Sequence, residues 1–225
     1  MAAKQLVSVC TPVYNGEKFL VDCISGVLAQ RYDNFEYIIV DNASTDRTPE
    51  IIERFRKEDS RIKVFRNPET LFIIDNFMTC ASHCSSESTW IKYALADDFL
   101  YPNCLEEMIR VAEQSPSVAL VSGLQVYGRA LRNRGLPVRQ SVFPGSEILK
   151  RELLRKLHVC SHSPNTLMYR KDAFEAAGGL HRKYLHSDTE LAFRLLDGYD
   201  FGFAHCALTQ TGLYGGRGMN RAESQ

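Results

Sequence analysis

The chain has 225 residues, 44% of them hydrophobic, and its 27 basic residues balance 27 acidic ones, so the formal net charge is zero. A balanced charge argues against a general nucleic-acid-binding protein, which normally carries a basic surplus. A nucleotide stays open as a ligand, because a metal ion neutralises a diphosphate locally. The length favours one α/β domain with an elaborated second half.

The sequence contains no membrane span and no secretion signal. No stretch approaches the roughly 18 consecutive apolar residues of a span, and residues 1–10 lack the apolar core and cleavage site of a signal peptide. The seven cysteines are scattered and odd in number, so no disulfide framework is implied. We expect a cytoplasmic protein without a transmembrane segment, which is compatible with peripheral membrane association. Cys80 and Cys84, with His83, lack the second pair that would complete a zinc site.

The first half of the sequence alternates strands and helices. Apolar, β-rich runs predict strands at Leu6–Cys10, Tyr37–Val40, Ile62–Phe65, Trp90–Leu95 and Val118–Val121. Apolar residues at helical spacing predict helices at 17–30, from Thr48-Pro49 onward, at 73–81 and after Pro102. This alternation implies right-handed crossovers and a parallel sheet with helices on both faces.

The second half is less regular. Residues 123–144 show little periodicity and are interpreted as a loop or a lid that closes over the site. The remaining patterns predict helices at Glu147–Leu157, Lys171–Ala177 and Ser187–Leu196, and a strand at Asn165–Tyr169. The polar, Gly-rich stretch after Leu213 is interpreted as a flexible tail.

Polar residues follow three of the predicted strands: Thr11-Pro12, Asp41 and Asp97-Asp98. In open α/β sheets, ligands bind outside the carboxyl ends of the strands. We therefore expect these three features to converge on one crevice.

The acidic residues at these strand ends each allow two interpretations. Adjacent carboxylates at Asp97-Asp98 repel each other unless a cation or hydrogen bonds compensate, and oxygen ligands suit Mg²⁺ or Mn²⁺ bound to phosphate. The pair could instead only favour the start of the helix near Pro102. Asp41 is either an acceptor for a nucleobase N–H or a turn residue, and as a strand-end residue it is not expected in the core.

Asp188 lies in the segment Ser187-Asp188-Thr189-Glu190, which has the pattern of a capping box with Ser187 as the cap. This pattern favours a structural acid in a first helical turn, although a helix that starts at a crevice also presents its carboxylate to a ligand. The motifs GxxxxGK[ST] and GxGxxG are absent, so neither a P-loop nor a Rossmann dinucleotide site is supported.

Taken in order from about Val7 to Gly198, these residues resemble the family 2 inverting glycosyltransferases of the GT-A fold. The resemblance is carried by VSVCTPVYNGEKFL, YIIVDNASTDRT, WIKYALADDFLYP and YRKDAFEAAGGL followed by HSDTELAFRLLDGY. It implies one α/β domain over residues 1–225 with a mostly parallel central sheet. Residues 1–122, approximately, would bind the nucleotide sugar, and residues 123–225 would form the acceptor and catalytic-base half.

The resemblance also implies roles for matching positions. Asp97 would hold Mg²⁺ or Mn²⁺ on the diphosphate with Asp98 beside it, and Asp188 would be the catalytic base. Leu95 stands where the family often has the first Asp of an Asp-x-Asp motif, so the choice between Asp97 and Asp98 as principal ligand stays open. The residues implied for the nucleoside are Thr11, Pro12, Tyr14, Glu17 and Asp41.

The implied reaction moves a sugar from a nucleotide-diphosphate donor, with UDP-sugar favoured, to a hydroxyl of a saccharide or lipid-linked acceptor. Transfer would proceed with inversion, in polysaccharide or glycoconjugate synthesis, without a nucleic-acid partner. A sugar-nucleotide pyrophosphorylase usually has a Gly-rich basic loop, whereas residues 11–19 contain one Gly and one Lys. A phosphoaspartate domain places its acids after the first strand, not the fourth. A binding module without turnover stays open because of Leu95.

Overall fold

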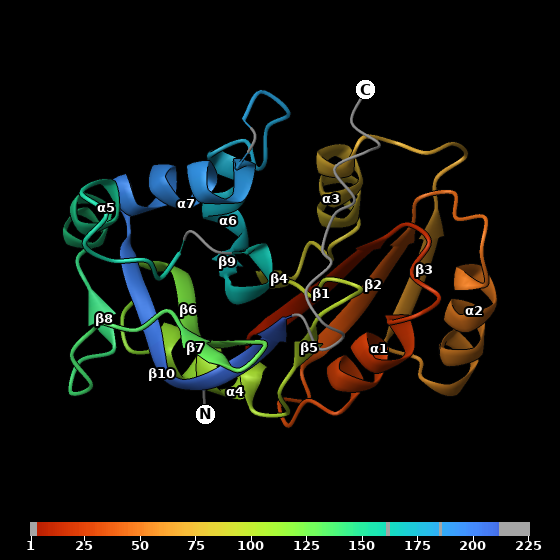
Figure 1. The fold of residues 1–225 in the computed structure, drawn as a ribbon, viewed down its shortest axis with the longest axis horizontal. Coiled ribbons are helices and arrows are strands. Elements are labelled where there is room, and N and C mark those ends of the chain that lie inside the picture. The colour runs from red at the N-terminus through yellow and green to blue at the C-terminus, as the bar shows by residue number, and fades with distance from the viewer. Residues whose placement is uncertain (1–3, 161–162, 185, 212–225) are drawn as a thin grey trace.

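In the computed structural model, which describes residues 4–160, 163–184 and 186–211, one ten-stranded sheet runs the width of the molecule (Figure 1). Eight strands follow in the order β3-β2-β1-β4-β9-β6-β10-β5, while β7 pairs with β6 and β8 pairs with β10. The predicted tail after Leu213 lies outside the described residues.

The first half forms the expected strand–helix alternation. Its elements are β1 (Leu6–Val13), α1 (Leu20–Leu28), β2 (Phe35–Asp41), α2 (Thr48–Glu58), β3 (Ile62–Arg66), α3 (Ile73–Ser82) and β4 (Ser88–Tyr93). Strands β3, β2, β1 and β4 pair in parallel. The predicted parallel arrangement of these four strands is therefore confirmed.

The second half contains the antiparallel pairings. Its elements are β5 (Phe99–Leu100), α4 (Cys104–Ala112), β6 (Val118–Tyr127), β7 (Ala130–Arg132), β8 (Val142–Phe143), α5 (Gly145–Leu153), the 3₁₀ turn η1 (Pro164–Thr166), β9 (Met168–Arg170), α6 (Lys171–Ala176), α7 (Ser187–Gly198) and β10 (Asp200–Thr211). Strand β9 is antiparallel to both β4 and β6, and β10 is parallel to β6. The six longer parallel strands consequently end at one edge, called the carboxyl edge below.

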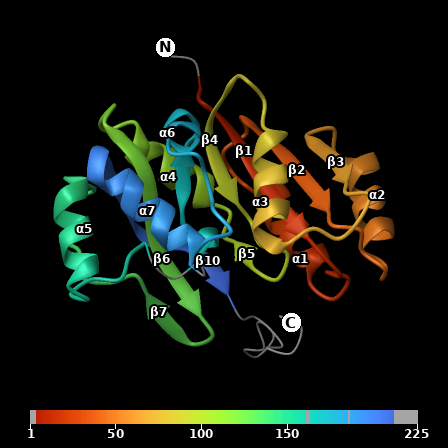
Figure 2. The same cartoon turned by 90° about the horizontal axis from the view of Figure 1, so that it is seen from above.

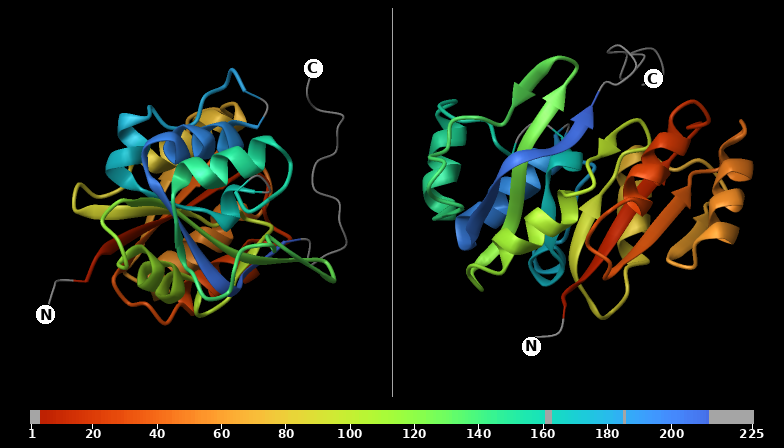
Figure 3. Two further views of the ribbon diagram at one scale, coloured as in Figure 1. Left: turned by 90° about the vertical axis from the view of Figure 1, so that its left-hand side faces the viewer. Right: turned by 90° about the horizontal axis from the view of Figure 1, so that it is seen from below.

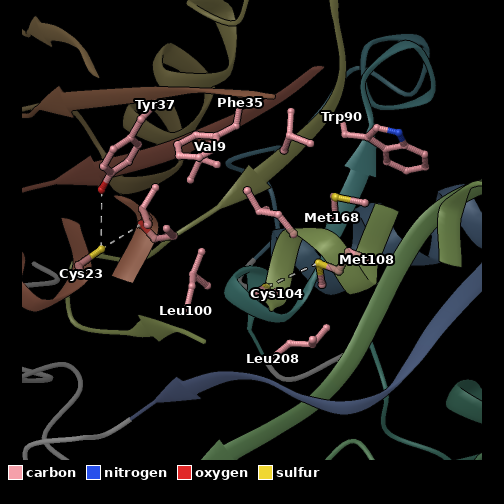
Figure 4. Packing of buried hydrophobic residues seen from close by; sticks show 14 of the residues in the cluster. Val9, Cys23, Phe35, Tyr37, Trp90, Leu100, Cys104, Met108, Met168 and Leu208 are labelled. Carbon is pink, nitrogen blue, oxygen red and sulfur yellow. Dashed lines mark hydrogen bonds between the residues drawn. The ribbon is translucent and has the colours of Figure 1, made fainter. Parts of the chain in front are cut away.

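Helices cover both faces of the sheet (Figures 1 and 3). Helices α1, α2 and α4 bury side chains in one apolar cluster, part of which Figure 4 shows around Val9, Trp90 and Met168. Helices α3, α5, α6 and α7 pack on the opposite face in a second cluster. Burial of both faces explains why the central strands read as continuous apolar runs.

The second half differs from the expectations drawn from the sequence in three places. Residues 123–144 are not a free lid, because β6 continues to Tyr127, a hairpin leads into β7, and the buried amide of Asn133 donates to the Gly123 carbonyl at 2.9 Å. The strand expected at Asn165–Tyr169 is divided into η1 and β9. The twelve-residue strand β10, which fills the sheet between β6 and β5, was not predicted.

Among the described residues, no helix combines the length and the apolar character needed to cross a bilayer. All seven cysteines are free thiols. The Sγ atoms of Cys10 and Cys84 lie 3.6 Å apart, and the Cys80 thiol donates to the Ile38 carbonyl at 3.5 Å. The ring of His83 stacks on Phe65. This region is therefore packing between α3 and the sheet, as the sequence favoured over a zinc site.

Gly145 in α5 and Gly198 in α7 allow the packing of the second half to be tested. A methyl group on Gly145, at the start of α5, would overlap the carbonyl oxygens of Leu196 and Tyr199, whereas Gly198 in α7 has no atom within 4 Å of the same position. We expect Gly145→Ala to lower the free energy of unfolding by about 3 kcal/mol. The matched control Gly198→Ala should change it by less than about 1 kcal/mol. Equal urea midpoints for the two variants would contradict this packing.

Candidate functional site

Side-chain hydrogen bonds join the loops that follow β1 and β2. The Asn15 N–H donates to Ser44 Oγ at 2.9 Å, and the Gly16 N–H donates to Thr48 Oγ1 at 2.8 Å. In return, the Thr45 N–H donates to Asn15 Oδ1 at 2.9 Å. Asn15 has a left-handed backbone with φ of 50°, a conformation that Asn tolerates better than most residues. The two loops are therefore held side by side at the carboxyl edge without a ligand.

The residues predicted to line a nucleoside pocket differ in what they present. Tyr14 is 49% exposed and Glu17 is exposed, so both side chains can reach a ligand. The Thr11 side chain is fully buried, where its hydroxyl donates to the Ala94 carbonyl at 2.7 Å and lies 2.9 Å from the Tyr37 hydroxyl. Pro12 is buried in β1. Thr11 therefore stabilises the sheet, and its side chain is not free to bind.

Asp41 ends β2 and is only 2% exposed. One carboxylate oxygen forms an ion pair with the guanidinium of Arg66, and the other accepts the Ser44 N–H at 3.0 Å. The expectation that Asp41 lies outside the core was therefore wrong. Arg66 itself is half exposed and also donates to the Ser44 carbonyl at 3.0 Å. No motif in the sequence identified Arg66, although it directly follows the predicted strand at Ile62–Phe65.

The acidic pair after β4 divides into an exposed and a buried carboxylate. Asp97 is exposed, whereas Asp98 is only 4% exposed. Neither carboxylate oxygen of Asp98 accepts a hydrogen bond of good geometry in the described part of the chain, although the Thr211 hydroxyl lies close enough to lower its pKa. Leu95, at the position where the resembled family often has the first Asp of Asp-x-Asp, packs against the apolar cluster of α3 and α7. This apolar contact holds the turn in place. A methyl group on Gly16 would lie 3.6 Å from Ala96, which places the loop after β1 beside this turn.

Burial raises the pKa of the Asp98 carboxyl to about 7, and the charge of Asp97 adds to the rise. The nearby Thr211 hydroxyl and the Lys92 ammonium act in the opposite direction without cancelling it. An isolated buried carboxylate is unfavourable, and a bound cation would relieve both the burial and the repulsion.

Lys92 is a buried cation in β4 that the sequence patterns did not identify. Its side chain is fully buried, and its ammonium donates to the main-chain carbonyl of Asn165 in η1. Burial lowers the pKa of Lys92 to about 8, while Cys104 and Asp98 oppose the decrease. The available signal was a single Lys inside the apolar run that forms β4.

The predicted capping box at α7 was wrong. The residue before the helix is His186, and Ser187 is its first residue. The Ser187 hydroxyl accepts the His181 N–H at 2.6 Å and so fixes the preceding loop. Glu190 does not reach back to a cap but pairs with Arg194 at 2.7 Å. Asp188 therefore lies in the first turn, one residue after the start of the helix.

The surroundings of Asp188 suit a group that accepts a proton. Burial raises the pKa of its carboxyl, and the N–H groups of Thr189 and Asp188 and the charge of His186 oppose the rise. Burial raises the pKa values of Cys160 and Tyr169, and the charge of Asp188 adds to the rise in both. The Tyr169 hydroxyl is fully buried and lacks a partner among the described residues. Asp188 is thus placed near two neutral groups rather than in an ion pair.

The sheet topology brings these features to one edge. Helix α7 runs back along the sheet before β10, so its first turn lies toward the end at which the arrows of β1 and β2 point (Figure 2). Tyr169 pairs with Ile91 in β4, and its ring lies edge-on to Tyr93 at 6.3 Å between centroids. Asp41 therefore ends a strand, and the acidic pair follows one, at the carboxyl edge, and the first turn of α7, which carries Asp188, lies toward the same edge.

The acidic pair fits a divalent cation. Asp98 supplies carboxylate oxygens without a partner, and Asp97 is exposed beside it. The described residues contain no group of three or more His, Cys, Asp or Glu that could hold a metal alone. Mg²⁺ commonly takes one or two carboxylates together with substrate phosphates, and this donor set matches that pattern.

Comparison with known sequences identifies the protein family. Residues 8–178 match the family described as Glycosyl transferase family 2. Glycosyltransferase GlyG from Streptococcus pneumoniae serotype 4 is 26% identical over 152 residues, which are 68% of this chain and 50% of that relative. The putative glycosyltransferase EpsE from Bacillus subtilis is 32% identical over 123 residues, 54% of this chain and 44% of EpsE. The chain spans about half the length of these curated relatives.

Solved structures share the fold at low sequence identity. S. aureus TarS 1-349 in complex with UDP-GlcNAc has a TM-score of 0.72 at 16% identity, covering 92% of this chain and 58% of that one. The mannosyltransferase PcManGT from Pyrobaculum calidifontis, in complex with GDP-Man and Mn²⁺, has a TM-score of 0.73 at 17% identity, covering 93% and 57%. The likeness shows a GT-A fold.

The raised pKa of Asp98 predicts how stability depends on pH. Between pH 4 and about 7 the folded protein holds a proton on Asp98 that the unfolded chain has lost, so the free energy of unfolding should fall as pH rises through this window. The shift from 3.8 to about 7 corresponds to at most about 4 kcal/mol. Urea unfolding in EDTA at pH 5 and pH 8 measures the effect.

Asp98→Asn should flatten this pH dependence and raise stability at pH 8, because an amide cannot be charged there. Asp97→Asn is the matched control, and its effect should be smaller because Asp97 is exposed. An unchanged pH dependence in Asp98→Asn would contradict the assignment.

Proposed function

The chain belongs to glycosyl transferase family 2, and we propose that it transfers a sugar from a nucleotide-diphosphate donor to an acceptor hydroxyl with inversion at the anomeric carbon. The observation that carries the proposal is the meeting of Asp41, Asp97-Asp98 and Asp188 at the carboxyl edge, with burial raising the pKa of Asp188. In this arrangement Asp188 would act as a base opposite a diphosphate bound at Asp97-Asp98.

Asp188 is the proposed general base. It removes the proton from the acceptor hydroxyl while that oxygen forms a bond to the anomeric carbon, and the bond from this carbon to the diphosphate oxygen breaks in the same step. Its raised pKa makes Asp188 a stronger base than an exposed carboxylate, while the N–H groups at the helix start favour its charged form.

The donor side divides the remaining roles. Tyr14 and Glu17 border the nucleoside, and Asp41 accepts a hydrogen bond from the base while Arg66 holds its carboxylate in place. Asp97 and Asp98 hold Mg²⁺ or Mn²⁺ on the diphosphate. When bound, the cation stabilises negative charge on the leaving diphosphate. UDP-sugar is the favoured donor, supported by the UDP-GlcNAc complex of one structural neighbour. A divalent cation is supported by the Mn²⁺ that another neighbour binds together with GDP-Man.

The acceptor is proposed to enter from the loop before α7. A surface hollow of about 330 Å³ there is lined by His181, Arg182, Lys183 and Tyr184. Arg182 forms an ion pair with Asp75 in α3, so this loop contacts the first half of the chain. The Ser187 hydroxyl accepts the His181 N–H and so joins this loop to the first turn of α7, which carries Asp188. A saccharide or lipid-linked acceptor in this hollow would be in keeping with polysaccharide or glycoconjugate synthesis.

Donor binding should depend on a divalent cation. We expect UDP to raise the melting temperature more with Mn²⁺ or Mg²⁺ than with EDTA, because the acidic pair needs a cation to approach a diphosphate. A ligand at 100 times its dissociation constant adds about 2.7 kcal/mol of stability. Thermal unfolding with UDP, GDP and their sugars measures this. An equal shift in EDTA would remove the metal from the proposal.

Asp188→Asn tests the base. The amide keeps the shape of the side chain but does not accept a proton at neutral pH, so transfer should fall by about 10²- to 10⁴-fold while donor affinity barely changes. Asp197→Asn is the matched control, because Asp197 is an exposed acid at the other end of α7. Transfer is measured as release of nucleoside diphosphate with a glycan acceptor. A binding module without turnover would release none in the wild type, and full activity in Asp188→Asn would exclude Asp188 as the base.

A further inference from the structure

Four residues near the acidic pair carry buried polar atoms that have no hydrogen-bond partner in the described part of the chain. They are Asp98 (both carboxylate oxygens), Gln125 (Oε1), Asn165 (Nδ2 and Oδ1) and Thr209 (Oγ1). None of the four is more than 4% exposed. Buried polar groups in folded proteins are nearly always bonded, so such a set points to a ligand or to water. We call these four residues the polar cluster.

The pairing of the strands brings three members of the cluster together. Thr209 in β10 is the register partner of Gln125 in β6. The Gln125 Nε2 donates to the Thr211 hydroxyl at 2.9 Å, which leaves only its Oε1 unpaired. Strand β5 runs antiparallel to β10 with Phe99 opposite Gln210, and continuing this register places Asp98 beside Thr211.

The fourth member is brought in by η1 and Lys92. The turn η1 packs against β4, β6 and β10. The buried Lys92 ammonium donates to the main-chain carbonyl of Asn165, so it fixes the backbone and leaves the side-chain amide unused. The Ser163 hydroxyl accepts the Asn165 N–H at 3.3 Å and holds the other side of the turn. Asn165 is thus firmly positioned, yet both polar atoms of its side chain have no partner.

The chemistry of the cluster selects a ligand that donates hydrogen bonds. Its unpaired atoms are oxygens on Asp98, Gln125, Asn165 and Thr209, and the only unpaired nitrogen is Nδ2 of Asn165. A phosphate, which only accepts, would meet mostly acceptors. A ring that carries hydroxyl groups on neighbouring carbons both donates and accepts.

We propose that Gln125, Asn165 and Thr209, together with Asp98, recognise hydroxyl groups of the sugar that is transferred. This inference rests on the proposed function, because the sugar comes attached to a diphosphate at the acidic pair. Asp97 is exposed, and its neighbour in the chain, the buried Asp98, is a member of the cluster. A sugar attached to a diphosphate at Asp97 would therefore lie close to the cluster.

Thr209→Val and Asn165→Ala test the inference. The dissociation constants of UDP, UDP-glucose, UDP-N-acetylglucosamine, GDP and GDP-mannose are measured by calorimetry with Mn²⁺ for the wild type and both variants. Each variant should weaken the nucleotide sugar that the wild type prefers by about 3- to 10-fold, the effect of one lost hydrogen bond. Affinity for the nucleoside diphosphate alone should stay within about two-fold, because those contacts are made elsewhere.

Thr166→Val is the matched control for stability. The Thr166 hydroxyl is also buried in η1 but donates to the Ser163 carbonyl at 2.8 Å. Thr166→Val should therefore lower the melting temperature of the free protein, whereas Thr209→Val should leave it unchanged or raise it. A decrease of equal size in Thr209→Val would show that its hydroxyl has a structural partner, which overturns the inference.

The outcomes separate this inference from the function on which it rests. If the wild type binds none of the nucleotides, the proposed function fails, and the inference fails with it. If the nucleotides bind but both variants keep the wild-type ratio of nucleotide-sugar to nucleoside-diphosphate affinity, the function stands and the cluster holds only water. Selective loss of affinity for the sugar supports the inference, since no structural role of the cluster would weaken the nucleotide sugar while leaving the diphosphate alone unaffected.

Discussion

The carboxylate of Asp98 is buried at the carboxyl edge without a hydrogen-bond partner among the described residues, and the arrangement around it follows from that charge. Burial and the neighbouring Asp97 both disfavour the ionised form. Lys92 offsets part of this, but its ammonium is directed to the Asn165 carbonyl rather than to the carboxylate. The chain therefore leaves a buried carboxyl group whose ionised form a bound cation would stabilise, which is what the proposed metal–diphosphate site requires.

The scaffold around this site is held by hydrogen bonds within the chain. Hydrogen bonds between Asn15, Gly16 and the segment 44–48 join the first two loops, and Ser187 fixes the loop before α7 through the His181 N–H. These bonds engage side chains whose types, Asn, Ser and Thr, also favour turns in the sequence. Preorganisation of this kind reduces the entropy that binding would otherwise lose.

Much of the fold and part of the candidate site could be predicted from the sequence. Apolar runs such as Tyr37–Val40 identify buried strands because both faces of the sheet are covered. Strand β10 was not predicted because its apolar and polar residues alternate regularly only around Phe201 and Phe203. Register shifts also interrupt its pairing with β6. Predictions made from local patterns also failed where long-range contacts decide the outcome: Asp41 is buried because Arg66, 25 residues later, pairs with it.

The same limit explains why Ser187 was assigned the wrong role and Asp188 the right position. A capping box is a pattern of four consecutive residues. The Ser187 hydroxyl instead accepts the N–H of His181, six residues earlier, so it does not cap the helix. Asp188 is thereby left in the first turn, where the free N–H groups of the helix favour its charge and burial disfavours it. The two influences oppose each other, and burial is the larger. A carboxylate in that balance holds a proton more readily than a surface acid, and this is the property that the proposed base needs when it accepts a proton from a hydroxyl group.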